Sequence, residues 1–157
     1  MEKGGAAMTE DRMPGGEALL GVFDHVYVVN LPERTDRLAD SERNFRRIGL
    51  SHDHPRVTVY PAHRPSERGE FPTIGTRGCF LSHMGVLERA LSEGHAHFLL
   101  MEDDADFASG FGTLMPQLAR ALGGRDWGML YGWNPARYGL PRTEARRIGW
   151  NCPLSGR

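Results

Sequence analysis

The chain has 157 residues, which is enough for one domain with a hydrophobic core and too few for two ordinary domains. Hydrophobic residues make up 39% and charged residues 25% of the sequence, as in a soluble globular protein, and the formal net charge of −1 offers no positive field for nucleic acid or an anionic membrane. The longest apolar runs have the length of strands, so we expect no transmembrane segment. The start of the chain lacks the order of a secretion signal, and we therefore expect a cytoplasmic protein.

The two cysteines, Cys79 and Cys152, lie far apart and form no C-x-x-C pattern. Neither a zinc site nor a disulfide framework is therefore expected, and both residues are predicted to be reduced thiols. The histidines include no H-E-x-x-H arrangement, so we expect most of them at the surface or in loops.

The first part of the chain predicts a leader followed by a buried strand and a helix. Residues 1–21 are rich in Gly, Met, Glu and Ala without an apolar period, and we expect a disordered leader there. The run His25–Leu31 is β-branched and aromatic, with the near-continuous hydrophobicity of a strand buried on both faces. A helix is predicted next, capped by Thr35 or Asp36 and ended by Gly49, because its apolar side chains fall on one face.

Strand and helix patterns continue to alternate along the rest of the chain. Further strands are expected at residues 56–60, 96–101 and 127–133, and further helices from a cap at Thr76 to near Gly94 and over residues 111–122. This alternation predicts the α/β class, with a mostly parallel sheet and right-handed crossovers. We expect one domain over residues 22–134 and an irregular tail over residues 135–157, which are rich in Arg, Gly and Pro.

Four acidic side chains directly follow the third expected strand: Glu102, Asp103, Asp104 and Asp106. In open parallel sheets ligands gather at the carboxyl ends of the strands, which is where this cluster falls. Carboxylates packed so closely repel one another, whereas a divalent cation accepts several hard oxygen ligands and removes the conflict. The alternative is an acidic turn that only solvates the end of a core strand.

Two arginines, Arg34 and Arg37, stand where the first long helix begins, just after the strand that ends near Asn30. They lie on neighbouring turns of one helix face, and a helix N-terminus adds free amides, so the arrangement suits a diphosphate. The alternative is a pair of solvated arginines in surface ion pairs, each contributing about 0–1 kcal/mol. Neither a G-x-G-x-x-G fingerprint nor a P-loop is present to compete for this role.

A third segment, residues 75–84, leads from two glycines into a helix. Gly78 would let a ligand approach the backbone closely. Ser82 and His83 lie one turn further, and the position of His83 near the apolar stripe favours a core or supporting role over that of a catalytic base. Cys79 lies in the first turn, where the helix dipole could lower its pKa, but without a partner thiol we interpret it as a packing residue.

Together the three segments resemble glycosyltransferase family 25, which includes bacterial lipooligosaccharide galactosyltransferases and the collagen galactosyltransferases. The resemblance rests on residues 26–37 (VYVVNLPERTDR), 78–83 (GCFLSH) and 101–104 (MEDD), and it covers roughly residues 24–133. It implies a Rossmann-like, nucleotide-sugar-binding GT-A fold that is incomplete at its C-terminal end, because family members continue well past the last expected strand.

The resemblance also implies a UDP-sugar donor, most often UDP-galactose, a divalent metal, commonly Mn²⁺, and a saccharide acceptor such as lipopolysaccharide or lipooligosaccharide. With such an acceptor, the expected cytoplasmic protein could lie at the periphery of the inner membrane. Asp104 matches the metal-binding acid of the family, while Asp103 is directed towards the donor. The expected donor-binding residues are Asn30, Arg34, Arg37, Gly78, Ser82, His83 and Asp103. The expected metal ligands are Asp104, Glu102 and Asp106, and no catalytic base is assigned.

Two other functions stay open at this point. The chain could be an inactive, truncated remnant that only binds a nucleotide-sugar. A metal-dependent phosphoester hydrolase could use the same acidic cluster, but it would need a nucleophilic Asp at the end of the first strand, where this sequence has Asn30.

Overall fold

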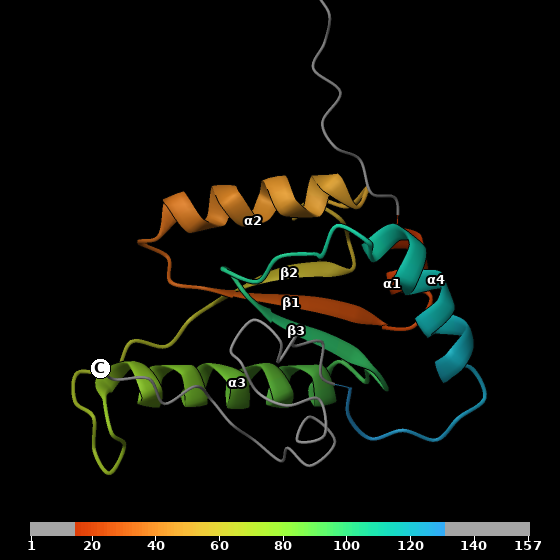
Figure 1. The fold of residues 1–157 in the computed structure, drawn as a ribbon. Coiled ribbons are helices and arrows are strands. Elements are labelled where there is room, and N and C mark those ends of the chain that lie inside the picture. The colour runs from red at the N-terminus through yellow and green to blue at the C-terminus, as the bar shows by residue number, and fades with distance from the viewer. Residues whose placement is uncertain (1–14, 131–157) are drawn as a thin grey trace, which may run out of the picture. The chain divides into compact units, whose positions relative to one another are not determined.

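The structure is a computed structural model that describes residues 15–130. The chain divides into two compact units, Met1–Gly124 and Arg125–Arg157. The described part of the first unit contains α1 (Gly16–Leu20), β1 (His25–Asn30), α2 (Thr35–Arg47), β2 (Val57–Pro61), α3 (Ile74–Ser92), β3 (Phe98–Glu102) and α4 (Phe111–Leu122) (Figure 1). The strands form one sheet in the order β2-β1-β3, and both pairings are parallel. The predicted α/β class with a parallel, Rossmann-like sheet is confirmed.

The central strand β1 is buried at every position, as its continuous hydrophobicity predicted. Helix α2 lies on one face of the sheet and α3 on the other (Figure 1). Tyr27 and Val29 point towards α3, where they form a core cluster with Val86 and Ala90. Because side chains alternate along a strand, the buried Val28 points to the opposite face. The sheet is thus covered on both sides, and the polar residues of the central strand β1, His25 and Asn30, lie at its two ends.

The two long helices begin differently from the prediction. Arg34 is the N-cap of α2 and makes no side-chain cap hydrogen bond, so neither Thr35 nor Asp36 caps this helix. In α3 the cap is Thr73, whose hydroxyl accepts a hydrogen bond from the Thr76 amide at 3.0 Å. Thr76, the expected cap, is instead the third residue of the helix, and its backbone amide donates to the side chain of the cap.

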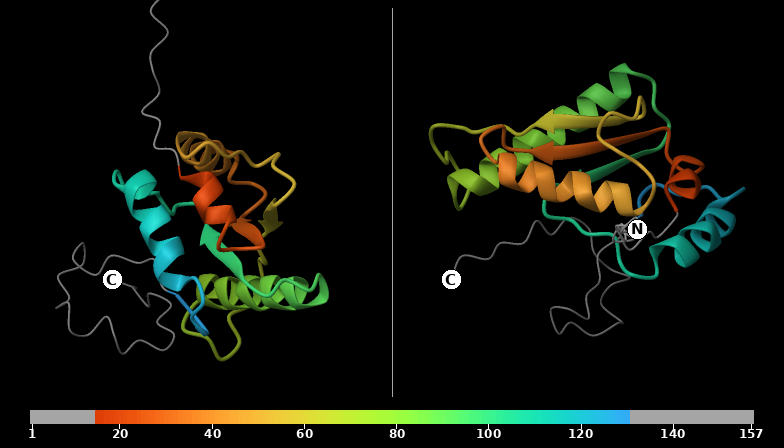
Figure 2. Two further views of the ribbon diagram at one scale, coloured as in Figure 1. Left: turned by 90° about the vertical axis from the view of Figure 1, so that its right-hand side faces the viewer. Right: turned by 90° about the horizontal axis from the view of Figure 1, so that it is seen from above.

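The expected leader is wrong for residues 16–21. Residues Gly16–Leu20 form α1, which lies beside α4 and buries Leu19 and Leu20 (Figure 2). The Gly16 amide also donates to the Ile48 carbonyl at 2.9 Å. A helix of one turn is too short to produce a helical period in the sequence, and burial of its two leucines holds it in place. Residues 1–14 and 135–157, the rest of the expected leader and the expected tail, lie outside the described residues.

The last expected strand, 127–133, is not formed over its described part, residues 127–130. Gly128 interrupts this run, and the side chains of Met129 and Leu130 are exposed. A strand needs a neighbouring strand to form the hydrogen bonds of its backbone N–H and C=O groups. The three described strands pair only with one another. Residues 131–133 lie outside the described part.

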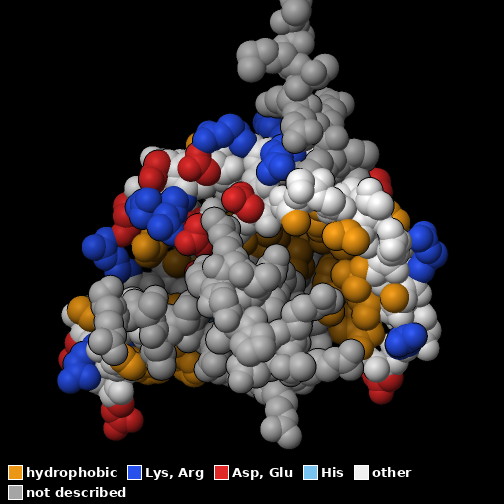
Figure 3. All heavy atoms as spheres, in the orientation of Figure 1, with side chains coloured by type: hydrophobic (Ala, Val, Ile, Leu, Met, Phe, Trp, Pro, Cys, Tyr) orange, Lys and Arg blue, Asp and Glu red, His pale blue; other side chains and the backbone are white. Residues whose placement is uncertain are grey.

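No helix within residues 15–130 is both long and apolar enough to cross a membrane. Charged side chains of both signs are interspersed over the α2 side of the molecule, whereas apolar side chains gather over the α4 side (Figure 3).

Candidate functional site

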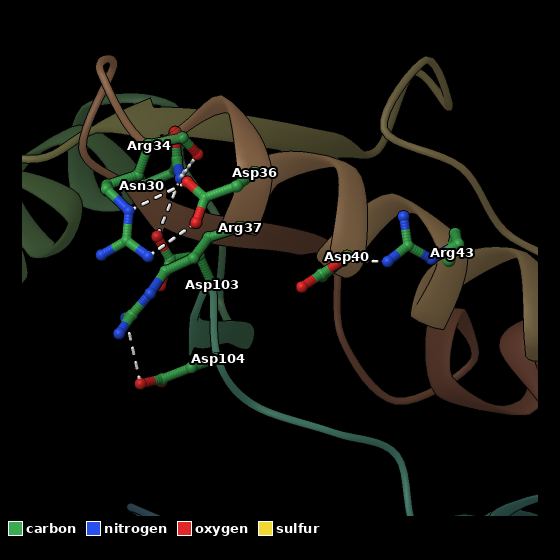
Figure 4. Close-up of polar contacts among 8 residues, drawn as sticks. All are labelled: Asn30, Arg34, Asp36, Arg37, Asp40, Arg43, Asp103 and Asp104. Atoms are coloured by element: carbon green, nitrogen blue, oxygen red, sulfur yellow. Dashed lines mark hydrogen bonds and ion pairs between the residues drawn. The ribbon is translucent and has the colours of Figure 1, made fainter.

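The candidate site lies where the carboxyl ends of β1 and β3 meet. Asn30 is the last residue of β1, and Asp103 directly follows β3. The Asp103 amide donates to the Val29 carbonyl at 3.1 Å, which extends the pairing of the strands by one residue. The Asn30 side-chain amide donates to Asp103 Oδ2 at 2.8 Å, and both side chains are buried (Figure 4). The backbone of two strands therefore fixes the position of this carboxylate.

A cationic group from α2 completes the cluster. Arg37 Nη1 lies 3.1 Å from Asp103 Oδ1 and 3.2 Å from Asp104 Oδ2 (Figure 4). Asp104 is 59% exposed, so one carboxylate of the pair is held inside the protein and the other is open to solvent. Two carboxylate oxygens thus converge on one atom, which is the arrangement that balances their repulsion.

The turn after Asp104 is fastened to α2. The Asn44 side-chain amide donates to the Ala105 carbonyl at 2.8 Å, and its oxygen accepts a hydrogen bond from the Phe107 amide at 3.3 Å. Phe107 in turn packs edge-on against Phe45. Asn44 was not predicted from the sequence, although a polar residue on the buried side of an amphipathic helix must find a hydrogen-bond partner, here the neighbouring backbone.

Arg34 does not join Arg37 in this cluster. Its guanidinium donates to both carboxylate oxygens of Asp36, at 2.9 and 2.7 Å, which holds the pKa of Asp36 well below its usual range. The Arg34 carbonyl accepts a long hydrogen bond of 3.3 Å from the Asn30 side chain. The expected arginine pair is thus divided: Arg37 faces the acidic residues, and Arg34 forms the local surface ion pair that was the alternative.

The four acidic residues are also divided. Glu102 Oε1 lies 3.3 Å from His83 Nε2 and 3.5 Å from Cys79 Sγ, away from Asp104. The hydrogen bond from His83 is the main cause of a lowered pKa at Glu102. Neighbouring residues at a strand end point to opposite sides, which explains why Glu102 and Asp103 separate. Within the described residues no hydrogen bond or ion pair connects Asp106 to either group, so Asp103 and Asp104 are the acids brought together.

Gly78 and Ser82 hold the loop after β2. The hydroxyl of Ser82, which is 0% exposed, accepts a hydrogen bond from the His63 amide at 2.8 Å and donates to the Gly78 carbonyl at 2.6 Å. A Cβ atom at Gly78 would lie 2.6 Å from the His63 carbonyl oxygen. The close backbone approach expected of Gly78 therefore exists, but it is made by the protein's own loop. A role of either residue towards the donor stays a prediction.

Cys79, which the sequence led us to interpret as a packing residue, lies beside two polar side chains. Its sulfur lies 3.8 Å from His83 Nε2, and both side chains come from the same face of α3. The signal was present in the sequence, because residues four apart on a helix are neighbours. Their meeting with Glu102 could not be predicted, since it depends on how α3 packs beneath β3.

Curated proteins of one family match this chain. A glycosyltransferase 25 family member of Anopheles gambiae is 31% identical over 149 residues, which cover 82% of this chain and 24% of that protein. A glycosyltransferase 25 family member of Drosophila pseudoobscura pseudoobscura is 34% identical over 101 residues, 54% of this chain and 16% of that protein. The human inactive glycosyltransferase 25 family member 3 is 26% identical over 127 residues, 69% of this chain and 21% of that protein.

The chain therefore spans about a quarter or less of the length of these relatives. No family model and no solved structure matches the chain. The relatives carry the same family name that the three motifs suggested. In the region that it shares with them, the chain belongs to glycosyltransferase family 25.

Proposed function

We propose that this chain forms the donor-binding side of a glycosyltransferase that moves a hexose, galactose, from a UDP-sugar to a saccharide acceptor such as lipopolysaccharide or lipooligosaccharide. The observation that carries the proposal is the arrangement of Asp103 and Asp104 around Arg37 at the carboxyl ends of β1 and β3. This is the edge at which parallel α/β sheets bind their ligands. A cytoplasmic location, at the periphery of the inner membrane, belongs to the same proposal because a glycolipid acceptor would be found there.

The residues at this edge fit a divalent metal such as Mn²⁺. Asp103 Oδ1 and Asp104 Oδ2 both lie within 3.2 Å of Arg37 Nη1, so two hard oxygen donors already converge on a single point. Small divalent ions are commonly held by one or two carboxylates together with phosphate oxygens of the substrate. Asp103 and Asp104 would hold the ion. The ion would neutralise the negative charge that develops on the diphosphate leaving group.

The chain's own residues have separate tasks in this scheme. Asn30 fixes Asp103 through the 2.8 Å hydrogen bond, so that the carboxylate keeps its direction whether or not a ligand is present. Arg37, which is partly exposed, offers its guanidinium to phosphate oxygens, for which charge-assisted hydrogen bonds are especially favourable. No residue is assigned as the base that takes the proton from the acceptor hydroxyl.

A binding protein without transferase activity is the second candidate. The human and mouse relatives are named inactive glycosyltransferase 25 family member 3, and the corresponding bovine and rat proteins are named probable inactive members. Such a chain would keep the nucleotide-sugar site and lose the transfer. The hydrolase alternative is less favoured, because the amide of Asn30 at the end of β1 is already engaged with Asp103 and with the Arg34 carbonyl.

Calorimetry and a sugar-release assay test the proposal. UDP should bind in Mn²⁺ and bind much more weakly in EDTA. An active enzyme should also release galactose from UDP-galactose slowly into water when no acceptor is present. Metal-dependent binding without release would support the inactive candidate, and absence of UDP binding in both buffers would contradict both.

Replacing Arg37 with alanine should weaken UDP and leave uridine nearly unchanged. A hydrogen bond between charged groups contributes about 1.5–3 kcal/mol, which is roughly a 10- to 150-fold change in Kd, and uridine has no phosphate to lose. Arg34→Ala is the matched control, because that guanidinium pairs with Asp36 and, unlike that of Arg37, forms no ion pair with Asp103 or Asp104. Parallel titrations of UDP and uridine into both variants measure the difference. Equal loss of the two ligands in Arg37→Ala would mean that the phosphate role is wrong.

A further inference from the structure

Three side chains of types that can bind a metal meet on the α3 side of the sheet, apart from the Asp103–Asp104 pair. Cys79 Sγ, His83 Nε2 and a carboxylate oxygen of Glu102 all lie within 4.8 Å of one another. Cys79 and His83 come from successive turns of α3, and Glu102 comes from the end of β3. His83 is 24% and Glu102 50% exposed, so solvent reaches the cluster.

The separations of these atoms match a tetrahedral ion. Zinc bonds of about 2.3 Å to sulfur and about 2.0–2.2 Å to nitrogen or oxygen place tetrahedral ligands about 3.6 Å apart for sulfur with nitrogen or oxygen, and about 3.4 Å apart for nitrogen with oxygen. The observed distances are 3.8 Å for Cys79–His83, 3.5 Å for Cys79–Glu102 and 3.3 Å for His83–Glu102. An ion would need only small side-chain shifts to bind all three.

The same geometry argues against a nucleophilic thiol relay. In such a relay the imidazole takes the proton of the thiol on one nitrogen and is oriented by a carboxylate on the other. Here Nε2 of His83 faces both Cys79 and Glu102. One nitrogen cannot serve both partners in a relay, whereas three ligand atoms directed at one point suit a cation.

We propose that Cys79, His83 and Glu102 bind a zinc ion, with the fourth tetrahedral position open to solvent. On binding, the Cys79 thiol releases its proton to solvent, and the ion is held by a thiolate, a neutral imidazole and a carboxylate. The two negative ligands balance its double positive charge. Thiolate and imidazole select zinc, while the all-oxygen pair Asp103–Asp104 suits Mn²⁺ or Mg²⁺, so the two sites differ in the metal that they take. This site does not depend on transferase activity.

Cobalt and cadmium titrations of the metal-stripped full chain test the site directly. We expect a thiolate-to-metal charge-transfer absorption that saturates near about one equivalent and is abolished by added Zn²⁺. Cys79→Ser should eliminate this absorption. His83→Gln and Glu102→Gln should each weaken Zn²⁺ binding by at least about 100-fold, because loss of a direct ligand exceeds the 10- to 100-fold effect of losing an outer partner.

Matched controls use residues of the same types. Cys152→Ser removes the other cysteine of the chain, and Glu88→Gln removes an exposed carboxylate of α3. Both variants should keep the absorption and the Zn²⁺ affinity of the wild type, and circular dichroism verifies that every variant is folded. The proposal is overturned if the wild type gives no such absorption, if the absorption is lost with Cys152 and not with Cys79, or if folded His83→Gln and Glu102→Gln bind Zn²⁺ like the wild type.

Discussion

Replacing Asp104 with alanine is expected to remove the dependence of UDP binding on Mn²⁺. Asp104 is the exposed member of the carboxylate pair, and within residues 15–130 its side chain pairs with Arg37 alone, so its loss should leave the fold intact. Asp103 would then be the one remaining carboxylate near the ion. We expect the apparent affinity for Mn²⁺ to fall by more than about 100-fold, since a direct ligand matters more than an outer one.

The measurement is a pair of UDP titrations, in Mn²⁺ and in EDTA, on wild type and variant. Asp106→Ala is the matched control, because Asp106 is also an exposed aspartate but no hydrogen bond or ion pair joins it to the Asp103–Asp104 pair within the described residues. If Asp104→Ala keeps the full difference between the two buffers, or if Asp106→Ala loses it, the assignment of the metal to the Asp103–Asp104 pair fails.

Replacing Gly78 with alanine is expected to destabilise the fold. The added Cβ would lie 2.6 Å from the His63 carbonyl oxygen, which is backbone and is held in place by the hydrogen bond between the His63 amide and Ser82. Forcing such an overpacked contact typically costs about 1–3 kcal/mol. The midpoint of thermal unfolding should fall by several degrees, because small domains have a small entropy of unfolding.

Gly75→Ala on the same helix separates this contact from the general effect of alanine. Among the residues that the structure describes, its Cβ would meet the Thr73 hydroxyl alone, at 3.7 Å, so the variant should be as stable as the wild type or slightly more stable. Thermal melts of the two variants decide between the explanations. Equal melting midpoints for Gly78→Ala and the wild type would show that the loop after β2 moves away at little cost.

The order of strands and helices could be predicted because its signals are local. The buried run that became β1 and the amphipathic face of α2 are both visible as periodicities, and the structure confirms them. Helix α1 was missed because a single turn has no period. The strand expected at 127–133 was wrong over residues 127–130, because apolar side chains around Gly128 do not form a strand without a neighbour to pair with.

The site was predictable at the level of the backbone but not of side-chain direction. Parallel strands end at the same edge, so the meeting of Asn30 with Asp103 followed from topology. The direction of Arg34 was decided by its pairing with Asp36. The sequence shows several acidic residues that could pair with Arg34 but does not tell which of them does. The direction of Glu102 was decided by His83 of α3, which is distant in the sequence and comes close to Glu102 only in the folded protein.

The position of Arg37 between two carboxylates implies that the site carries its own counter-ion. A cation that takes over Asp103 and Asp104 frees the guanidinium for an anion, and an anion that engages the guanidinium frees the carboxylates for a cation. By thermodynamic linkage each ligand must then raise the affinity for the other by the same factor. Metal and diphosphate would therefore bind cooperatively, and this one side chain would couple them.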